Sequence, residues 1–212
     1  MPAAAAKPEA MFEGWDNYFV LLGTASAGLI GLLFVVITLT SNFERSRALW
    51  AAGIYMTPIA VHFAAVLTIS AIAMVPGLTP GVVAVLVALM GFGGLAAASR
   101  TCVGILGISK SGDPPHWSDL WGYGVGPAAA YVAIVAAAAA IWLGRAWAVY
   151  ALAAVLLSLL LLAIRNAWDL ITWMAPQGAK PPESWPAADE PAPPASDQAT
   201  SDQATKENRA GV

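Results

Sequence analysis

The chain has few charged residues, since Asp, Glu, Lys and Arg make up only 11% of its 212 residues. Soluble proteins carry about 25%. Hydrophobic residues make up 58%, far above the share that a water-soluble globule contains. Ten Lys and Arg stand against thirteen Asp and Glu, so the chain lacks the basic surface that binding to a phosphate backbone requires. These deficits exclude a soluble domain and indicate that nucleic acid is not a partner.

Side chains that could act in catalysis or bind a metal are also scarce. Cysteine occurs once, at Cys102, which rules out a disulfide within the chain and a metal site shared by two cysteines. His62 and His116 are the only histidines, and we expect them at different depths. The glycine-rich segment at Gly91 follows no strand, so it does not match a dinucleotide-binding loop. The sequence therefore predicts no catalytic residues, no metal and no cofactor, and a protein that is not an enzyme.

The sequence contains long apolar runs with few charged residues. A transmembrane helix needs about 20 mainly apolar residues. Trp121 and Trp142 are 21 residues apart, as are Trp147 and Trp168, which in a helix spans about 31 Å, the thickness of the hydrocarbon layer. We predict an all-α fold, a five-helix transmembrane bundle within residues 17–175. The predicted spans are residues 17–40, 49–75, 81–108, 120–144 and 146–168.

The two ends of the chain differ from the spans. Residues 1–16 form a short N-terminal segment that we expect outside the cytoplasm. Residues 176–212 are rich in proline and contain Ser-Asp-Gln-Ala-Thr twice, which predicts a disordered acidic tail. The cytoplasmic side of a membrane protein carries the excess of Lys and Arg. Five spans place Lys7 and Arg145 on one side, and the other side has six cations: Arg45, Arg47, Arg100, Lys110, Arg165 and Lys180. This predicts a multi-pass protein of the cytoplasmic (inner) membrane with its C-terminus inside.

His62 is the most informative single residue. It lies twelve residues after Trp50, or about 18 Å along a helix, which is close to the middle of the bilayer. An ionisable group at that depth suggests a functional site by default, here a proton relay or gate next to Thr57 and the helix break at Pro58. The alternative is a neutral imidazole that hydrogen-bonds a Ser, a Thr or a backbone carbonyl of another span. The sequence leaves both interpretations open.

Two further features concern the inner interface and helix packing. One predicted depth contains four charged residues: Arg100, Asp119, Arg165 and Asp169. They could form a charged pocket that binds an anionic headgroup or a partner loop. Alternatively, the arginines only extend to the interface and set the topology.

Small residues recur every four positions in the first span and form a close-packing stripe, and span three contains a similar pair. These residues are Gly23, Ala27 and Gly31 in the first span, and Gly94 and Ala98 in the third.

Residues 15–39, WDNYFVLLGTASAGLIGLLFVVITL, together with the later segment RNAWDL at residues 165–170, resemble a family of small bacterial integral membrane proteins without established function. Some of these proteins are labelled as modulators of a membrane-bound AAA protease. The resemblance covers about 31 residues in these two segments and transfers no functional residue to this sequence.

Three functional hypotheses follow. The first is a non-catalytic accessory or regulatory subunit that acts through helix packing, with the lipid bilayer, other membrane proteins or a second copy as partners. The second is an oligomeric channel or proton-coupled small-molecule transporter that uses His62. The third, a lipid-processing enzyme at the inner interface, lacks a nucleophile or metal near the predicted charge cluster.

Overall fold

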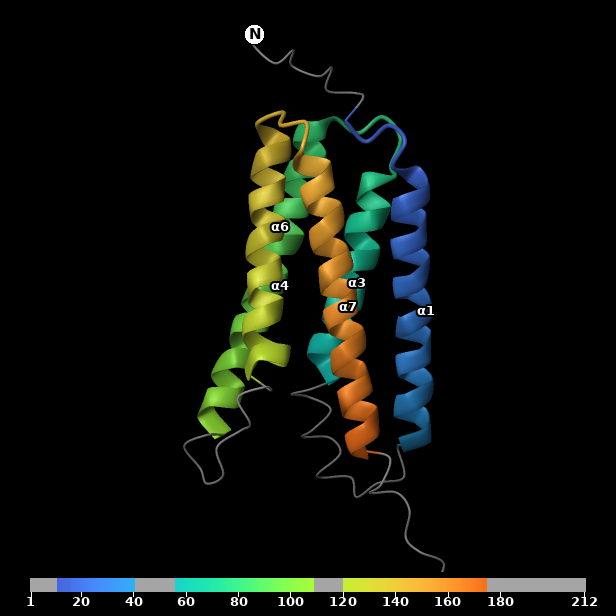
Figure 1. Ribbon diagram of the computed structural model, residues 1–212, viewed down its shortest axis with the longest axis vertical. Coiled ribbons are helices and arrows are strands. Elements are labelled where there is room, and N and C mark those ends of the chain that lie inside the picture. Colours follow the sequence, from blue (N-terminus) through green and yellow to red (C-terminus); the bar gives the residue numbers. More distant parts are fainter. Residues whose placement is uncertain (1–10, 41–55, 109–119, 175–212) are drawn as a thin grey trace, which may run out of the picture. The chain divides into compact units, whose positions relative to one another are not determined.

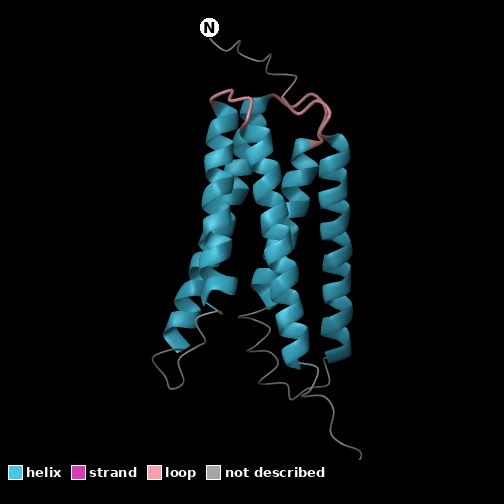
Figure 2. Cartoon of the chain, viewed as in Figure 1, coloured by secondary structure: helices cyan, strands magenta, loops and turns pink. Residues whose placement is uncertain are grey.

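The computed structural model describes residues 11–40, 56–108 and 120–174, and these residues contain helices and turns but no strand (Figures 1 and 2). The elements are α1 (Asp16–Thr40), α3 (Thr57–Ala73), α4 (Pro80–Ile108), the π-helical turn η3 (Leu120–Val125), α6 (Gly126–Trp142) and α7 (Ala148–Met174). The predicted all-α bundle is therefore confirmed. The predicted tail, residues 176–212, lies outside the described residues, as do residues 1–10 of the predicted N-terminal segment.

Four described segments are long and apolar enough to cross a membrane: α1, α4, η3 with α6, and α7. α3 is apolar but has 17 residues, and the first part of its predicted span, residues 49–55, lies outside the described residues. The helices alternate in direction along the chain (Figure 1). The chain is therefore a multi-pass membrane protein, as the sequence indicated.

Short turns with glycine join the helices at the end of the bundle where α1 begins. Gly77 follows α3 with a φ of 77°, and Gly144 follows α6 with a φ of 66°. This backbone conformation costs glycine little and strains other residues, so each glycine permits a tight reversal. The second turn is longer than predicted, because α6 ends at Trp142 and α7 begins at Ala148, which leaves Arg145 exposed in the turn.

The helices are apolar on both their inner and their outer faces. The core includes Ile59, Phe63 and Ile69 of α3 and Leu152 and Leu156 of α7, all with less than 2% of their surface exposed. Large apolar side chains are also exposed on the outside of α1, α4, α6 and α7, among them Leu21, Phe34, Leu89, Val103, Val132 and Leu161. A surface of this kind fits a hydrocarbon environment and would be unfavourable in water.

α4 and α6 approach each other closely at two glycines. A Cβ atom at Gly91 would lie 2.7 Å from Cγ2 of Val135, and a Cβ atom at Gly94 would overlap the ring of Tyr131. Ala98, one turn after Gly94, is also buried. The pair of small residues predicted for span three therefore lies in a helix interface.

The packing face of α1 differs from the predicted stripe. Gly23 faces α3, since a Cβ atom there would lie 3.5 Å from Cβ of Ser70, but Ala27 and Gly31 are exposed. A repeat of four residues turns by about 40° per step around an α-helix, so the stripe leaves the interface after its first member. The buried face of α1 instead contains Phe19, Leu22, Gly23, Ser26 and Leu33.

We expect Gly94→Ala to destabilise the bundle by about 1–3 kcal/mol, because the added methyl group forces Tyr131 or the backbone of α4 to shift. Unfolding of the purified protein in mixed detergent micelles measures this change. Gly93→Ala is the matched control, since a Cβ atom at Gly93 meets nothing within 4 Å. Equal stability of the two variants would contradict the close contact between α4 and α6.

Candidate functional site

Buried polar side chains are few in the described part of the chain: Ser26, His62, Ser70 and Asn166. Within hydrocarbon a polar group without a hydrogen-bond partner costs several kcal/mol, so its partner is informative. Ser26, His62 and Asn166 each form a hydrogen bond to another helical element, and they define the candidate sites.

His62 of α3 pairs with Tyr131 of α6. Its Nδ1 and the Tyr131 Oη are hydrogen-bonded at 2.9 Å, and both side chains are fully buried. Tyr131 lies ten residues after Trp121 and eleven before Trp142, or about 15 Å from each along a helix. If these tryptophans mark the two interfaces, the pair lies near the middle of the bilayer, the depth predicted for His62.

The His62–Tyr131 pair is enclosed by packed helices. The Tyr131 ring lies against Gly94 of α4, and His62 lies among buried α3 residues such as Ile59 and Phe63. Among the described residues, Nε2 of His62 has no hydrogen-bond partner. The geometry matches the structural interpretation of His62 more closely than a proton relay, with a tyrosine hydroxyl in place of the expected Ser, Thr or carbonyl.

A second hydrogen bond holds α3 on its other side. Ser26 of α1 donates its hydroxyl to the carbonyl oxygen of Phe63 at 2.6 Å, next in sequence to His62. Tyr18, also on α1, donates to the carbonyl oxygen of Ala153 in α7 at 2.9 Å. α3 is therefore fixed to α1 and α6 by two consecutive residues, and α1 is also fixed to α7.

Asn166 joins α7 to the π-helical turn η3. Its Nδ2 donates to the carbonyl oxygen of Gly122 at 2.7 Å, and Tyr123 donates its hydroxyl to the Asn166 carbonyl oxygen at 2.9 Å. A Cβ atom at Gly122 would lie 3.1 Å from Oδ1 of Asn166, so a larger residue there would require the Asn166 side chain to shift by a few tenths of an ångström. π-helical turns are rare and are frequent at functional sites.

The predicted charge cluster does not form as one unit among the described residues. Arg165 and Asp169 make the expected i, i+4 ion pair at 3.4 Å, but both are about half exposed, so the pair adds little stability. Arg100 does not join them and forms no ion pair with a described residue. Asp119 lies outside the described residues.

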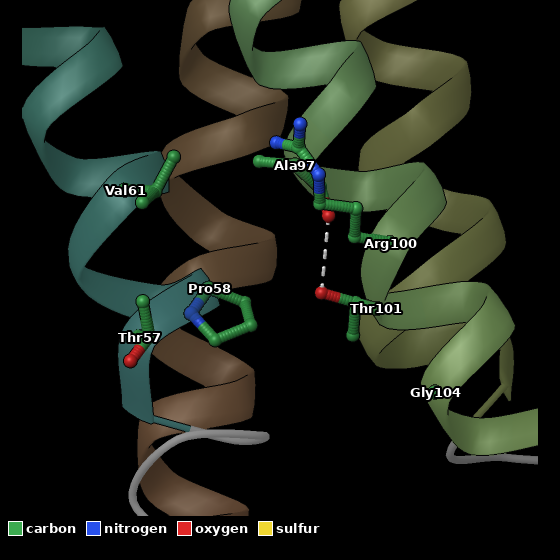
Figure 3. Close-up of a pocket in the computed structure, with 7 residues that line it drawn as sticks. All are labelled: Thr57, Pro58, Val61, Ala97, Arg100, Thr101 and Gly104. Carbon is green, nitrogen blue, oxygen red and sulfur yellow. Dashed lines mark hydrogen bonds between the residues drawn. The ribbon is translucent and has the colours of Figure 1, made fainter.

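Arg100 instead lines a groove of about 320 Å³ between α3 and α4 (Figure 3). The sequence-predicted site at His62 is therefore divided, because Thr57 and Pro58 line this groove while His62 faces α6. Thr57 and His62 are five residues apart, which places them about 140° apart around the helix, whereas Pro58 is about 40° from His62. Rotation around α3 therefore separates His62 from Thr57 but not from Pro58. The groove brings together residues from the two predicted sites.

Two of these partners were not identified from the sequence. Tyr131 lies midway between Trp121 and Trp142 in the sequence. This position indicates that Tyr131 lies at the same depth as His62. Asn166 is an isolated amide in an apolar helix, a residue type that often bonds a neighbouring helix in membranes.

The described residues contain no group of three His, Cys, Asp or Glu side chains that could hold a metal ion. Comparison with protein-family models, curated proteins and solved structures finds no match. The candidate functions therefore depend on the geometry of this chain's own helices.

We expect a double-mutant cycle of His62→Ala and Tyr131→Phe to give a coupling free energy of about 0.6–1.7 kcal/mol, the range for hydrogen bonds between membrane helices. Unfolding in mixed micelles of the wild type, both single variants and the double variant measures it. Tyr150→Phe, which removes the hydroxyl of an exposed tyrosine, should change stability by less than about 0.5 kcal/mol. Additive effects of the two substitutions would contradict the bond.

Proposed function

We propose that the chain is a non-catalytic accessory or regulatory subunit of a bacterial cytoplasmic membrane complex, acting through helix packing. The observation that carries this proposal is the outer face of α1, where four small side chains are exposed together: Thr24, Ala27, Gly28 and Gly31. In lipid, small residues let helix backbones approach closely, which is a main source of association energy. This face suits a transmembrane helix of another protein.

α1 is also the least covered of the four long spans. In the most apolar stretch of α1, 22% of the residues are buried inside the chain. The corresponding share is 33% in α4 and 44% in each of the other two long spans. Its inner face is fixed by the Ser26 and Tyr18 hydrogen bonds, so the outer face has a defined orientation. The resemblance to proteins labelled as protease modulators makes a membrane-bound AAA protease the first partner to examine.

The transporter alternative has weaker support. It requires His62 on a pathway for ions or substrate, whereas His62 is fully buried and bonded to Tyr131. A fixed helix contact is the role that this arrangement favours.

We expect Gly28→Leu to reduce recovery of a membrane partner at least tenfold when the tagged full-length chain is captured in mild detergent. A steric cost of about 1.4 kcal/mol at the interface is enough for this loss. Gly93→Leu is the matched control, because both glycines are exposed and a Cβ atom at either meets nothing within 4 Å. Equal recovery with all three proteins, or no stoichiometric partner with the wild type, would overturn the proposal.

The proposed orientation places the N-terminus outside and the C-terminus in the cytoplasm. The turns at residues 74–79 and 143–147 lie at the end where α1 begins, and α1, α4 and α7 end at the opposite end of the bundle (Figure 1). Arg100 of α4 and Arg165 of α7 belong to helices that end there, and the cation count along the sequence assigns four further cations to the same side of the membrane, which favours the cytoplasmic side.

We expect a fluorescent reporter that matures only in the cytoplasm to be active when fused after Val212. A phosphatase reporter that is active only outside should be inactive at the same position, because five spans place the ends on opposite sides. The same phosphatase fused in the turn at Arg145 should be active. The reverse pattern would show that cation placement does not set the topology.

A further inference from the structure

Arg100 lies at the depth where the sequence predicts the inner membrane interface. It is twenty residues after Pro80, the first residue of α4, which is about 30 Å along the helix and matches the hydrocarbon thickness. Its side chain runs back along α4 past Ala97, and Thr57, Pro58 and Val61 of α3 line the opposite side of the groove (Figure 3). The remaining described residues that line this groove are uncharged, so Arg100 makes it cationic.

A second groove lies on the other side of α3. It has a volume of about 500 Å³ and lies between α1 and α3. Apart from Thr57, its lining is apolar: Ile30, Leu33, Phe34 and Ile37 from α1, Met56 directly before α3, and Ala60, Val61 and Ala64 from α3. This groove is suited to hydrocarbon.

The two grooves meet along one row of α3. Thr57 and Val61 line both of them, and Ala64 continues the same row one turn further on. These three positions lie on one helix face, and their side chains are small. The row therefore forms a low ridge between a cationic groove and an apolar groove, an arrangement that fits an amphipathic ligand.

We propose that the chain binds an anionic phospholipid at this position. The phosphate pairs with the Arg100 guanidinium, whose planar set of N–H donors matches phosphate oxygens, and one acyl chain crosses the ridge at Val61 into the groove between α1 and α3. Charge complementarity favours an anionic over a zwitterionic headgroup, because Arg100 forms no ion pair with a described carboxylate.

The test uses the full-length chain in detergent and measures the binding of added lipid by native mass spectrometry. We expect phosphatidylglycerol to bind more tightly than phosphatidylcholine with the same acyl chains. Arg100→Gln should weaken phosphatidylglycerol binding about fivefold and leave phosphatidylcholine binding unchanged. Arg165→Gln is the matched control, because Arg165 is a half-exposed cation paired with Asp169 outside the groove.

A second variant tests the apolar groove. Ala64→Phe adds volume at an exposed position, so we expect it to weaken binding of both lipids. Glycerol phosphate, which has the headgroup charge without acyl chains, should not displace phosphatidylglycerol at an equal concentration.

Three results would overturn the proposal. The first is equal binding of the two lipids by the wild type. The second is an equal loss of phosphatidylglycerol binding in Arg100→Gln and Arg165→Gln, which would indicate diffuse charge in place of a site. The third is displacement by glycerol phosphate, which would identify a soluble phosphate as the ligand.

Discussion

The arrangement of the described helices depends most on the hydrogen bonds between helices, because a polar group without a partner is costly in hydrocarbon. Nε2 of His62, Oγ of Ser70 and Oδ1 of Asn166 are the buried side-chain atoms of the described residues that have no such partner. α3 contains the polar residues at the centre of the bundle, and consecutive positions fix it on two sides: Phe63 accepts from Ser26 of α1, and His62 bonds Tyr131 of α6. The second bond needs room for the Tyr131 ring, which Gly94 of α4 provides. One polar pair thus sets the rotation of α3 and α6 and the closeness of α4.

The positions of the long spans could be predicted from the sequence, because span length follows from bilayer thickness and from the run of apolar residues. The faces of the helices could not. A helix in lipid is apolar all round, so its sequence lacks the polar stripe that marks the outer face of a soluble helix. Within the described part of the chain, only Gly23 of the predicted stripe lies against another helix, whereas Ala27 and Gly31 are exposed.

Partners were harder to predict than the polar residues themselves. His62 was identified from its depth, but its bond to Tyr131 depends on the rotation of two helices, which packing determines. The same holds for Asn166, whose bond to the turn η3 depends on the close contact of α7 with Gly122. Arg100 was grouped with Arg165 by depth, yet its helix face directs it to Thr57 and Pro58. Depth is encoded along the sequence, whereas direction depends on the neighbouring helices.

The two proposed contacts of α1 use adjacent faces of the same helix. The proposed docking face contains Ala27, Gly28 and Gly31, and the lipid-lining face contains Phe34 and Ile37. At about 100° per residue the centres of these faces are roughly 100° apart. Ala27 and Phe34, which are seven residues apart, differ by only about 20° around the helix, so a partner helix and an acyl chain would contact each other at this edge of α1. Loss of the lipid would then remove a neighbour of the docked helix while leaving its contacts with α1 in place. The proposals about partner and lipid are therefore physically compatible and can be judged separately.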